Sequence, residues 1–282
     1  MDIHIMEALG KAKVVVKNGE VVEVGEPLIK YCPLFNKHRD IKELTKETIK
    51  KNIEFRIKDF GLFTENRIVE SKECIVKFGT SEIFMTALDR GILEAVVIVS
   101  DCAGTVITNN PYLVQGLCGR ISGIVKTSPI PKVIEKIENA GGTILNKNTG
   151  EIDQYKGVKL ALELGYKRIG VSISNLKDAE RIKKLESKEV SIITFGVHTT
   201  GYSSSEVRKY LKYLDIITCC ASKGVLEAVK GHIMVQMGKS IPIFALSKSG
   251  KELLLERAKE IDEPLLIDLP KNLPSINKDF HI

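Results

Sequence analysis

From about residue 80 onward, short apolar runs alternate with amphipathic segments, and this alternation most limits the possible fold. Repeated strand-helix units with short connections favour a mostly parallel sheet flanked by helices on both faces. We therefore predict an α/β fold, with a doubly wound sheet favoured over a barrel although the strand count approaches eight. The strands are expected at 93–99, 142–145, 167–173, 190–197, 215–219, 241–246 and 264–268.

Helix beginnings are marked by residue pairs and capping boxes typical of the first helical turn. Proline fits the first turn because it has no N–H to satisfy there, and a hydroxyl followed three residues later by glutamate can cap in both directions. Helices are therefore expected to begin at Asn110-Pro111, at Ser128-Pro129, at "SSSE" from Ser203 and at "SGKE" from Ser249.

The first 79 residues have a different pattern and predict a small α+β region. In "KVVVKNGEVVEV", Asn18 and Gly19 join two β-branched runs, which is a strong hairpin signal because both residues tolerate positive φ. Asp40 is the expected N-cap of a following helix with apolar residues at helical spacing. A chain of 282 residues has room for two domains, and we place them at 1–79 and 80–282.

The composition excludes several classes of protein. Hydrophobic residues make up 43% and charged residues 28%, as in an ordinary folded domain. The first residues lack a signal-peptide pattern and no apolar run approaches the roughly 20 residues that span a bilayer, so a cytoplasmic protein without membrane partners is expected. The net charge of +6 comes from lysines that alternate with glutamates, which argues against a nucleic-acid partner.

Ligands of such folds bind beyond the carboxyl ends of the strands, so the loops there are the places to search. These loops contain many glycines, hydroxyls and lysines, which suit an anion because backbone N–H groups, helix N-termini and ammonium groups attract negative charge. The alternative is that Ser222 and Ser249 only cap helices and that the lysines are solvated. The candidate ligand-binding residues are Ser100, Gly104, Thr105, Arg120, Ser174, Thr199, Ser222, Lys223, Lys248 and Ser249.

Three residues are candidates for catalysis: Asp101, Cys102 and His198. "VIVSDCAGTVI" resembles the D-x-D-G-T loop of haloacid-dehalogenase-type phosphatases, in which the first aspartate attacks phosphorus. Ala103 stands where that family has its acid and base, so a phosphatase of this kind would be degenerate. His198 follows a strand and could be a general base, a metal ligand, an anion contact or a structural residue.

The six cysteines form no CxxC pair and predict no zinc or cluster motif. Most are expected to be small core residues. Cys32, Cys102 and Cys118 fall in loop-like stretches and are the candidates for a metal site built from distant thiols. The glycines near Arg120 lack the strand-first context of a dinucleotide site, so no particular cofactor is predicted.

Long stretches of the chain also resemble the methanogenesis marker protein 8 family. They are "YCPLFNKHRD", "FGTSEIFMTALDRGILEAVVIVSDCAGTVI", "PYLVQGLCGRISG", "IDQYKGVKLALELGY", "CCASKGVLEAV" and "IPIFALSKSGKEL". The resemblance implies an archaeal, anaerobic and cytosolic setting and a role linked to methyl-coenzyme M reductase. It implies no particular catalytic residues.

The favoured hypothesis is therefore a methanogenesis accessory protein. It would bind an anionic small molecule or cofactor and support maturation or activation of methyl-coenzyme M reductase, with that enzyme or its assembly factors as partners. One alternative is an enzyme acting on a phosphorylated or thiol substrate, and another is a non-catalytic interaction scaffold. If the candidate residues converge in one cleft, the accessory-protein and enzyme hypotheses are favoured, and if they do not, the scaffold hypothesis is favoured.

Overall fold

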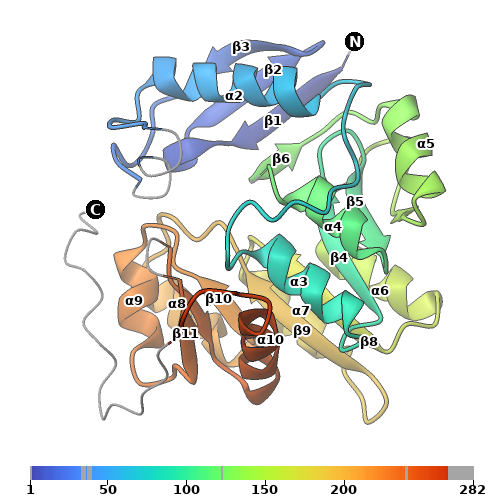
Figure 1. Cartoon of the computed structure of the whole chain (residues 1–282), viewed down its shortest axis with the longest axis vertical. Coiled ribbons are helices and arrows are strands. Elements are labelled where there is room, and N and C mark those ends of the chain that lie inside the picture. The colour runs from blue at the N-terminus through green and yellow to red at the C-terminus, as the bar shows by residue number, and fades with distance from the viewer. Residues whose placement is uncertain (1, 33–35, 37–39, 122, 239–240, 266–282) are drawn as a thin grey trace.

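The computed structural model describes residues 2–32, 36, 40–121, 123–238 and 241–265, and these residues form two sheets with helices around them (Figure 1). The larger sheet contains, from edge to edge, β11 (Val235–Met237), β12 (Ile243–Ala245), β10 (Ile216–Thr218), β9 (Ser191–Gly196), β8 (Arg168–Ile173), β4 (Ala95–Ser100), β5 (Gly104–Thr108) and β7 (Thr143–Ile144). The smaller sheet contains β3 (Glu20–Val24), β2 (Lys13–Lys17), β1 (Ile3–Glu7) and β6 (Ile124–Lys126).

The larger sheet confirms the predicted α/β class. Strands β4, β8, β9 and β10 run parallel to one another and form its centre. Because β11 and β7 lie at opposite ends of the strand order, the sheet is open and is not a barrel. The strand expected at 264–268 falls at the limit of the described residues, and 266–268 lie outside them.

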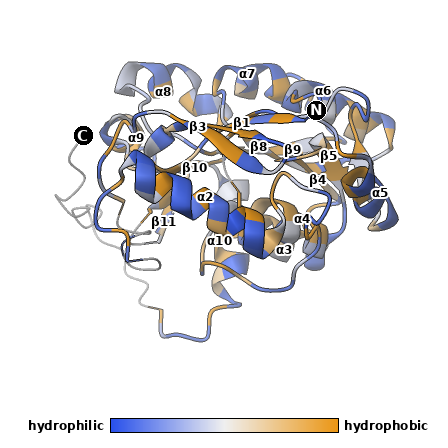
Figure 2. Ribbon diagram, turned by 90° about the horizontal axis from the view of Figure 1, so that it is seen from above, coloured by the Kyte–Doolittle hydropathy of each residue, from blue (hydrophilic) through white to orange (hydrophobic). Residues whose placement is uncertain are grey.

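Helices cover both faces of the larger sheet, and alternate residues of β4 show how the two layers divide. Val96 and Ile98 pack on one side with α3 (Thr80–Asp89), α4 (Pro111–Cys118), α5 (Pro131–Asn139) and α10 (Lys248–Ala258). Ala95 and Val97 pack on the other with α6 (Gln154–Glu163), α7 (Lys177–Lys183), α8 (Ser204–Tyr210) and α9 (Lys223–Val229). Figure 2 shows α6, α7 and α8 on one side of the strands and α3, α4 and α10 on the other.

The outer strands are antiparallel, which the alternation pattern did not indicate. β5 follows β4 directly as a hairpin, with Ser100 opposite Gly104, and β12 runs antiparallel to β10. The expectation that every strand-to-helix loop opens at the same edge is therefore wrong for the loop after β12. Its reversed direction puts the beginning of α10 at the opposite edge from the carboxyl ends of β9 and β10.

The smaller sheet confirms the predicted hairpin and adds one distant strand. β2 and β3 pair antiparallel through Asn18 and Gly19, whose φ angles are 48° and 79°. β6 pairs with β1, although about 120 residues separate them in sequence, so residues beyond 79 also build this sheet. Helix α2 (Lys46–Phe60) covers one face, and its Ile49 and Ile53 are fully buried there.

Two of the predicted helix beginnings are confirmed. The side chain of Asn110 accepts hydrogen bonds from Tyr112 and Leu113 at the beginning of α4. Ser203 and Glu206 form the expected capping box of α8. The first backbone N–H groups of a helix have no carbonyl partner within the helix, and both segments have a capping side chain, with a proline or a glutamate, at those positions.

Three other predicted beginnings are wrong by two to five residues. α2 begins after Thr45, which forms a capping box with Thr48, and Asp40 lies outside it. α5 begins at Pro131, while Ser128 bonds the backbone of Ile3. α10 is capped by Ser247 and not by Ser249. In each case a neighbouring residue offers the same capping chemistry or proline at the first turn, so sequence alone does not decide the position.

None of the helices in the described part of the chain is both long and apolar enough to cross a membrane.

Candidate functional site

The carboxyl ends of the central parallel strands meet at the edge of the larger sheet that faces the smaller sheet (Figure 1). Here Thr199 donates its hydroxyl proton to the carbonyl of Thr218 at 2.7 Å, and Thr200 donates to Cys220 at 2.7 Å. The phenol of Tyr202 donates to the carbonyl of Ser174, also at 2.7 Å. The loops after β8, β9 and β10 are thus tied into one surface.

His198 lies at the centre of the contact between this edge and the smaller sheet. Its Nε2 is 2.8 Å from Oε2 of Glu7, and its side chain is 14% exposed. Lys11 follows β1 and approaches the same carboxylate, with Nζ 3.8 Å from Oε2. The hydrogen bond from His198 lowers the pKa of Glu7 against an opposing contribution from burial. The contact is therefore a histidine, a carboxylate and an ammonium brought together from two sheets.

Backbone strain gathers at the same edge. Cys102, His198 and Ala221, which follow β4, β9 and β10, have φ angles of 65°, 56° and 44°. Left-handed backbone costs about 1–3 kcal/mol in residues other than glycine, and such residues are more frequent at functional sites. The strain makes this edge the strongest candidate for function within the described residues.

The loop after β4, in contrast, is a closed structural turn. Asp101 accepts a hydrogen bond from Nε of Arg67 at 2.9 Å and another from the backbone N–H of Phe63 at 2.8 Å. Both side chains of the ion pair are fully buried. An aspartate that is sealed from solvent and neutralised by a guanidinium is poorly suited to attack phosphorus, so this geometry favours a structural role.

Cys102 shares this buried environment. Its thiol lies 3.6 Å from Oδ2 of Asp101, and burial followed by that negative charge raises its pKa well above the ordinary value. Its N–H donates to the hydroxyl of Thr127, which is also 2.7 Å from Nδ1 of His4. His4 is fully buried, its Nε2 has no hydrogen-bond partner among the described residues, and burial lowers its pKa. These groups tie the smaller sheet to the hairpin.

The other candidate ligand residues fall into three places. Ser100 and Thr105 are buried in the β4–β5 hairpin, and Gly104 takes its positive-φ position. Arg120 pairs with Glu73 and stacks 3.8 Å from the ring centre of Phe60. Ser174, Thr199, Ser222 and Lys223 lie at the carboxyl edge, where Ser222 caps α9 and Lys223 is exposed.

Lys248 and Ser249 are not at this edge. The hydroxyl of Ser247, which precedes them, lies 2.6 Å from Asp215 at the amino-terminal end of β10. Lys248 lines a shallow depression with Lys251, Glu252, Leu255 and Glu256, in which acidic and basic groups are mixed. The expectation that Lys248 and Ser249 share an edge with Ser222 and Lys223 is therefore wrong, because β12 runs in the opposite direction to β10.

The candidate thiols are distributed over separate cores. Cys32 packs with the smaller sheet, whereas Cys102 and Cys118 pack with the α3–α4 layer. Burial raises the pKa of Cys118 to about 12, which disfavours the thiolate that metals bind. In the described ranges, no group of three or more His, Cys, Asp and Glu side chains is arranged to hold a metal ion.

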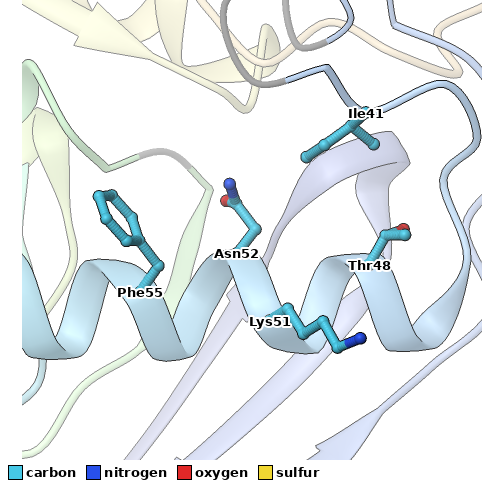
Figure 3. A pocket seen from close by; sticks show the side chains of 5 residues that line it. All are labelled: Ile41, Thr48, Lys51, Asn52 and Phe55. Carbon is cyan, nitrogen blue, oxygen red and sulfur yellow. The ribbon is translucent and has the colours of Figure 1, made fainter.

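A second shallow depression lies on α2 (Figure 3). It is lined by Ile41, Thr48, Lys51, Asn52 and Phe55. Asn52 is 6% exposed and its Oδ1 has no hydrogen-bond partner among the described residues. The sequence pattern predicted none of these residues as part of a site.

Glu7, Lys11 and Arg67 are the important residues that the sequence did not indicate. Glu7 and His198 are 191 positions apart, and Arg67 and Asp101 are 34 apart. Glu7 and Lys11 look like ordinary exposed charges beside β1. A local pattern carries no signal for such pairs, because each forms only when the smaller sheet lies on the larger one.

Comparison with known proteins places the chain in a family. Residues 4–259 match a family model described as "Uncharacterized protein conserved in archaea (DUF2099)". The chain is 64% identical over 277 residues to Uncharacterized protein MJ0054 of Methanocaldococcus jannaschii, covering 98% of this chain and 97% of that protein. No solved structure matches. The chain thus belongs to the family of uncharacterised proteins conserved in archaea, DUF2099.

Proposed function

We propose that the protein binds an anionic small molecule or cofactor between the carboxyl edge of β8–β10 and the smaller sheet, and so supports maturation or activation of methyl-coenzyme M reductase. The observation that carries the proposal is the contact of His198 with Glu7 at an edge where strained backbone gathers. Ligands of open α/β sheets bind at this edge. The strain is retained at a cost in stability, which a binding role accounts for.

The charges available at this edge support an anionic ligand. Lys11 lies beside Glu7, and Lys223 is exposed on the first turn of α9, the helix that follows β10. Glu7 offsets part of this charge, so the ligand is expected to meet lysine donors and the ring of His198 beside one carboxylate. Charge-assisted hydrogen bonds from such donors are shorter and stronger than those between neutral groups.

The link to methane metabolism rests on relatives. The relative from Methanocaldococcus jannaschii is a protein of a methanogen, and the chain resembles the methanogenesis marker protein 8 family. Coenzyme M, coenzyme B and the nickel tetrapyrrole of methyl-coenzyme M reductase are all anionic. The chemistry of the edge and the setting of the relatives therefore agree on the class of ligand.

Binding is tested by calorimetry with 2-mercaptoethanesulfonate, coenzyme B and the isolated nickel tetrapyrrole. His198→Gln is expected to weaken binding of the cognate molecule about tenfold or more, the loss of one charge-assisted hydrogen bond. Lys248→Gln, at the opposite edge, is the matched control and should leave binding unchanged. Binding that depends on Lys248, or binding by none of the three molecules, would contradict the proposal. Conversion of a bound molecule would instead favour the enzyme alternative.

The cellular role is tested by deleting the gene in a methanogen that encodes this protein. We expect less active methyl-coenzyme M reductase in the deletion strain, restored by the wild-type protein and not by His198→Gln. Unchanged cofactor pools together with a fully active reductase would rule out the accessory role.

A further inference from the structure

We propose that Glu7 positions His198 so that its Nδ1 is the proton acceptor of the site, facing a protic O–H, N–H or S–H group of the bound molecule. The role of the ligand rests on the proposed function above. The arrangement of the two side chains does not, because it is a property of the protein alone.

The hydrogen bond between the two side chains fixes the form of the ring. Nε2 of His198 is 2.8 Å from Oε2 of Glu7, and an ionised carboxylate can only accept. Nε2 must therefore carry the proton, and in the neutral ring Nδ1 holds the free electron pair. Nδ1 has no hydrogen-bond partner among the described residues, while the side chain keeps 14% exposure.

Glu7 is itself held in place and kept ionised. Its backbone N–H donates to the carbonyl of Gly123 at 2.7 Å, and Lys11 Nζ lies 3.8 Å from its carboxylate. The Lys11 ammonium also lies 5.5 Å from the ring centre of Tyr202, in the loop that follows His198. The pKa of Glu7 is lowered, first by the hydrogen bond from His198. The carboxylate is thus a fixed acceptor with contacts to both sheets.

Gly123 covers the Nε2 side of the ring. It has a φ of 63°, and a Cβ there would lie 2.8 Å from Nε2 of His198 and 2.3 Å from the carbonyl oxygen of Glu7. Only glycine allows this close approach. A Cβ there would also lie 2.9 Å from Cε1 of His198, so Gly123 and Glu7 occupy the Nε2–Cε1 edge of the ring, and Nδ1 is the ring nitrogen left for a ligand.

The backbone of His198 adds a reason to assign the ring a function. Its φ of 56° lies in the left-handed region, which residues other than glycine adopt uncommonly. A side chain that only filled space would not require histidine at this position. The hydrogen bond to Glu7 across the two sheets gives the ring an orientation that a solvated histidine lacks.

The proton balance defines the class of ligand. When X–H of the ligand gives its proton to Nδ1, the electron pair stays on X and the ring becomes an imidazolium, whose charge Glu7 neutralises. No oxidant or metal is needed for this step. The ligand is therefore an anionic molecule with a weakly acidic hydroxyl, amine or thiol next to its anionic group.

Nitrogen NMR of the ligand-free protein, labelled with ¹⁵N-histidine, tests the role of Glu7. We expect His198, assigned by the loss of its signals in His198→Gln, to show a protonated Nε2, an unprotonated Nδ1 and an Nε2–H proton protected from exchange with water. Glu7→Ala should abolish that protection, and Glu7→Gln provides a second variant of nearly unchanged size. Glu23→Ala, on the same sheet in an exposed pair with Lys13, is the control. A protonated Nδ1, or a signal insensitive to Glu7, would overturn the proposal.

A matched pair of probes tests the acceptor role. 2-Mercaptoethanesulfonate carries a thiol proton, and its S-methyl thioether does not. We expect the wild type to bind the thioether about tenfold more weakly than the thiol. We expect His198→Gln to bind the two probes with equal affinity. Equal affinities for the wild type would overturn the acceptor role. If neither probe binds, the proposed function loses its support, while the ring spectrum still decides the role of Glu7.

Discussion

The strand ends of the larger sheet divide into two regions that differ in almost every physical respect. After β4, the buried Asp101 is paired with Arg67 and is bonded by the backbone of Phe63. After β9, His198 keeps partial exposure, a hydrogen bond to a carboxylate of the other sheet, and one ring nitrogen that has no partner among the described residues. Both regions contain strained backbone and polar residues. Among the described residues, Nε2 of His4 in the first region has no partner but is fully buried, whereas the second region has an unpartnered ring nitrogen on a partly exposed side chain.

The difference shows what burial does to the same residue types. A carboxylate with no exposure must be paired inside the protein, because an unpaired buried charge costs several kcal/mol. A carboxylate with 36% exposure, such as Glu7, can exchange its partner for water or ligand. Polar residues at a strand end therefore indicate a functional site only when their partners in the protein leave a hydrogen-bond donor or acceptor free for a ligand.

The largest contrast is expected in thiol reactivity. Cys102 and Cys219 are fully buried, and burial raises the pKa of Cys219 to about 12, whereas Cys220 is half-buried. Because the thiolate is the reactive form, alkylation by iodoacetamide should label Cys220 about 10³-fold or more faster than Cys102 and Cys219, which react only after unfolding. Mass spectrometry of the native protein over time measures this. Similar rates at Cys102 and Cys220 would show that the two regions do not differ in access.

The next largest effect is on stability. Asp101→Asn leaves Arg67 buried without its counter-charge, and we expect the free energy of unfolding to fall by about 3–5 kcal/mol. Denaturant unfolding measures the change. Glu23→Gln, which breaks the exposed pair with Lys13, is the control and should cost less than about 1 kcal/mol. A loss of similar size in both variants would remove the distinction between a sealed and an open region.

The fold could be predicted from the sequence to the extent that it depends on local pattern. Runs such as 167–173 and 190–197 are rich in apolar residues, as is typical of strands buried on both faces, and they became β8 and β9. The hairpin at Asn18-Gly19 was predictable because two positive φ angles require those residues. β11 was missed because it is only three residues long. It pairs antiparallel with β12.

The site was predictable only in part, because it is built from two sheets. His198 was found, since it follows a strand in the parallel core and the ends of such strands form one edge. Glu7 was not, because nothing near β1 indicates which loop it will contact. Asp101 was predicted as a catalytic candidate because its motif resembles a phosphatase loop, but its carboxylate accepts a hydrogen bond from Arg67. The resemblance of a local motif is outweighed by partners that lie elsewhere in the sequence.

A smaller effect is expected from the pH dependence of the sealed region. Burial lowers the pKa of His4 below the ordinary value of 6.5, so the unfolded chain binds a proton more readily than the folded one. The stability due to neutral His4 is complete above pH 6.5 and is lost as the pH falls from there toward the folded pKa. Unfolding of the wild type and of His4→Gln between pH 8 and pH 4 should show a steeper loss in the wild type. Parallel curves would contradict a buried neutral His4.

The smallest effect concerns the strain at the open edge. Ala221 has a φ of 44°, so Ala221→Gly relieves the strain of a left-handed alanine. Glycine also gives the unfolded chain more conformational entropy, which lowers the free energy of unfolding by about 0.4–1 kcal/mol. Ala140→Gly carries the same unfolded-state cost at a φ of −84°, where alanine is unstrained. Both alanines are half-buried, so the difference between the two variants isolates the strain. We expect Ala221→Gly to be more stable than Ala140→Gly by about 1–2 kcal/mol. Equal stabilities in denaturant unfolding would mean that the loop after β10 stores no strain, and the open edge would then lose one of the two observations that set it apart.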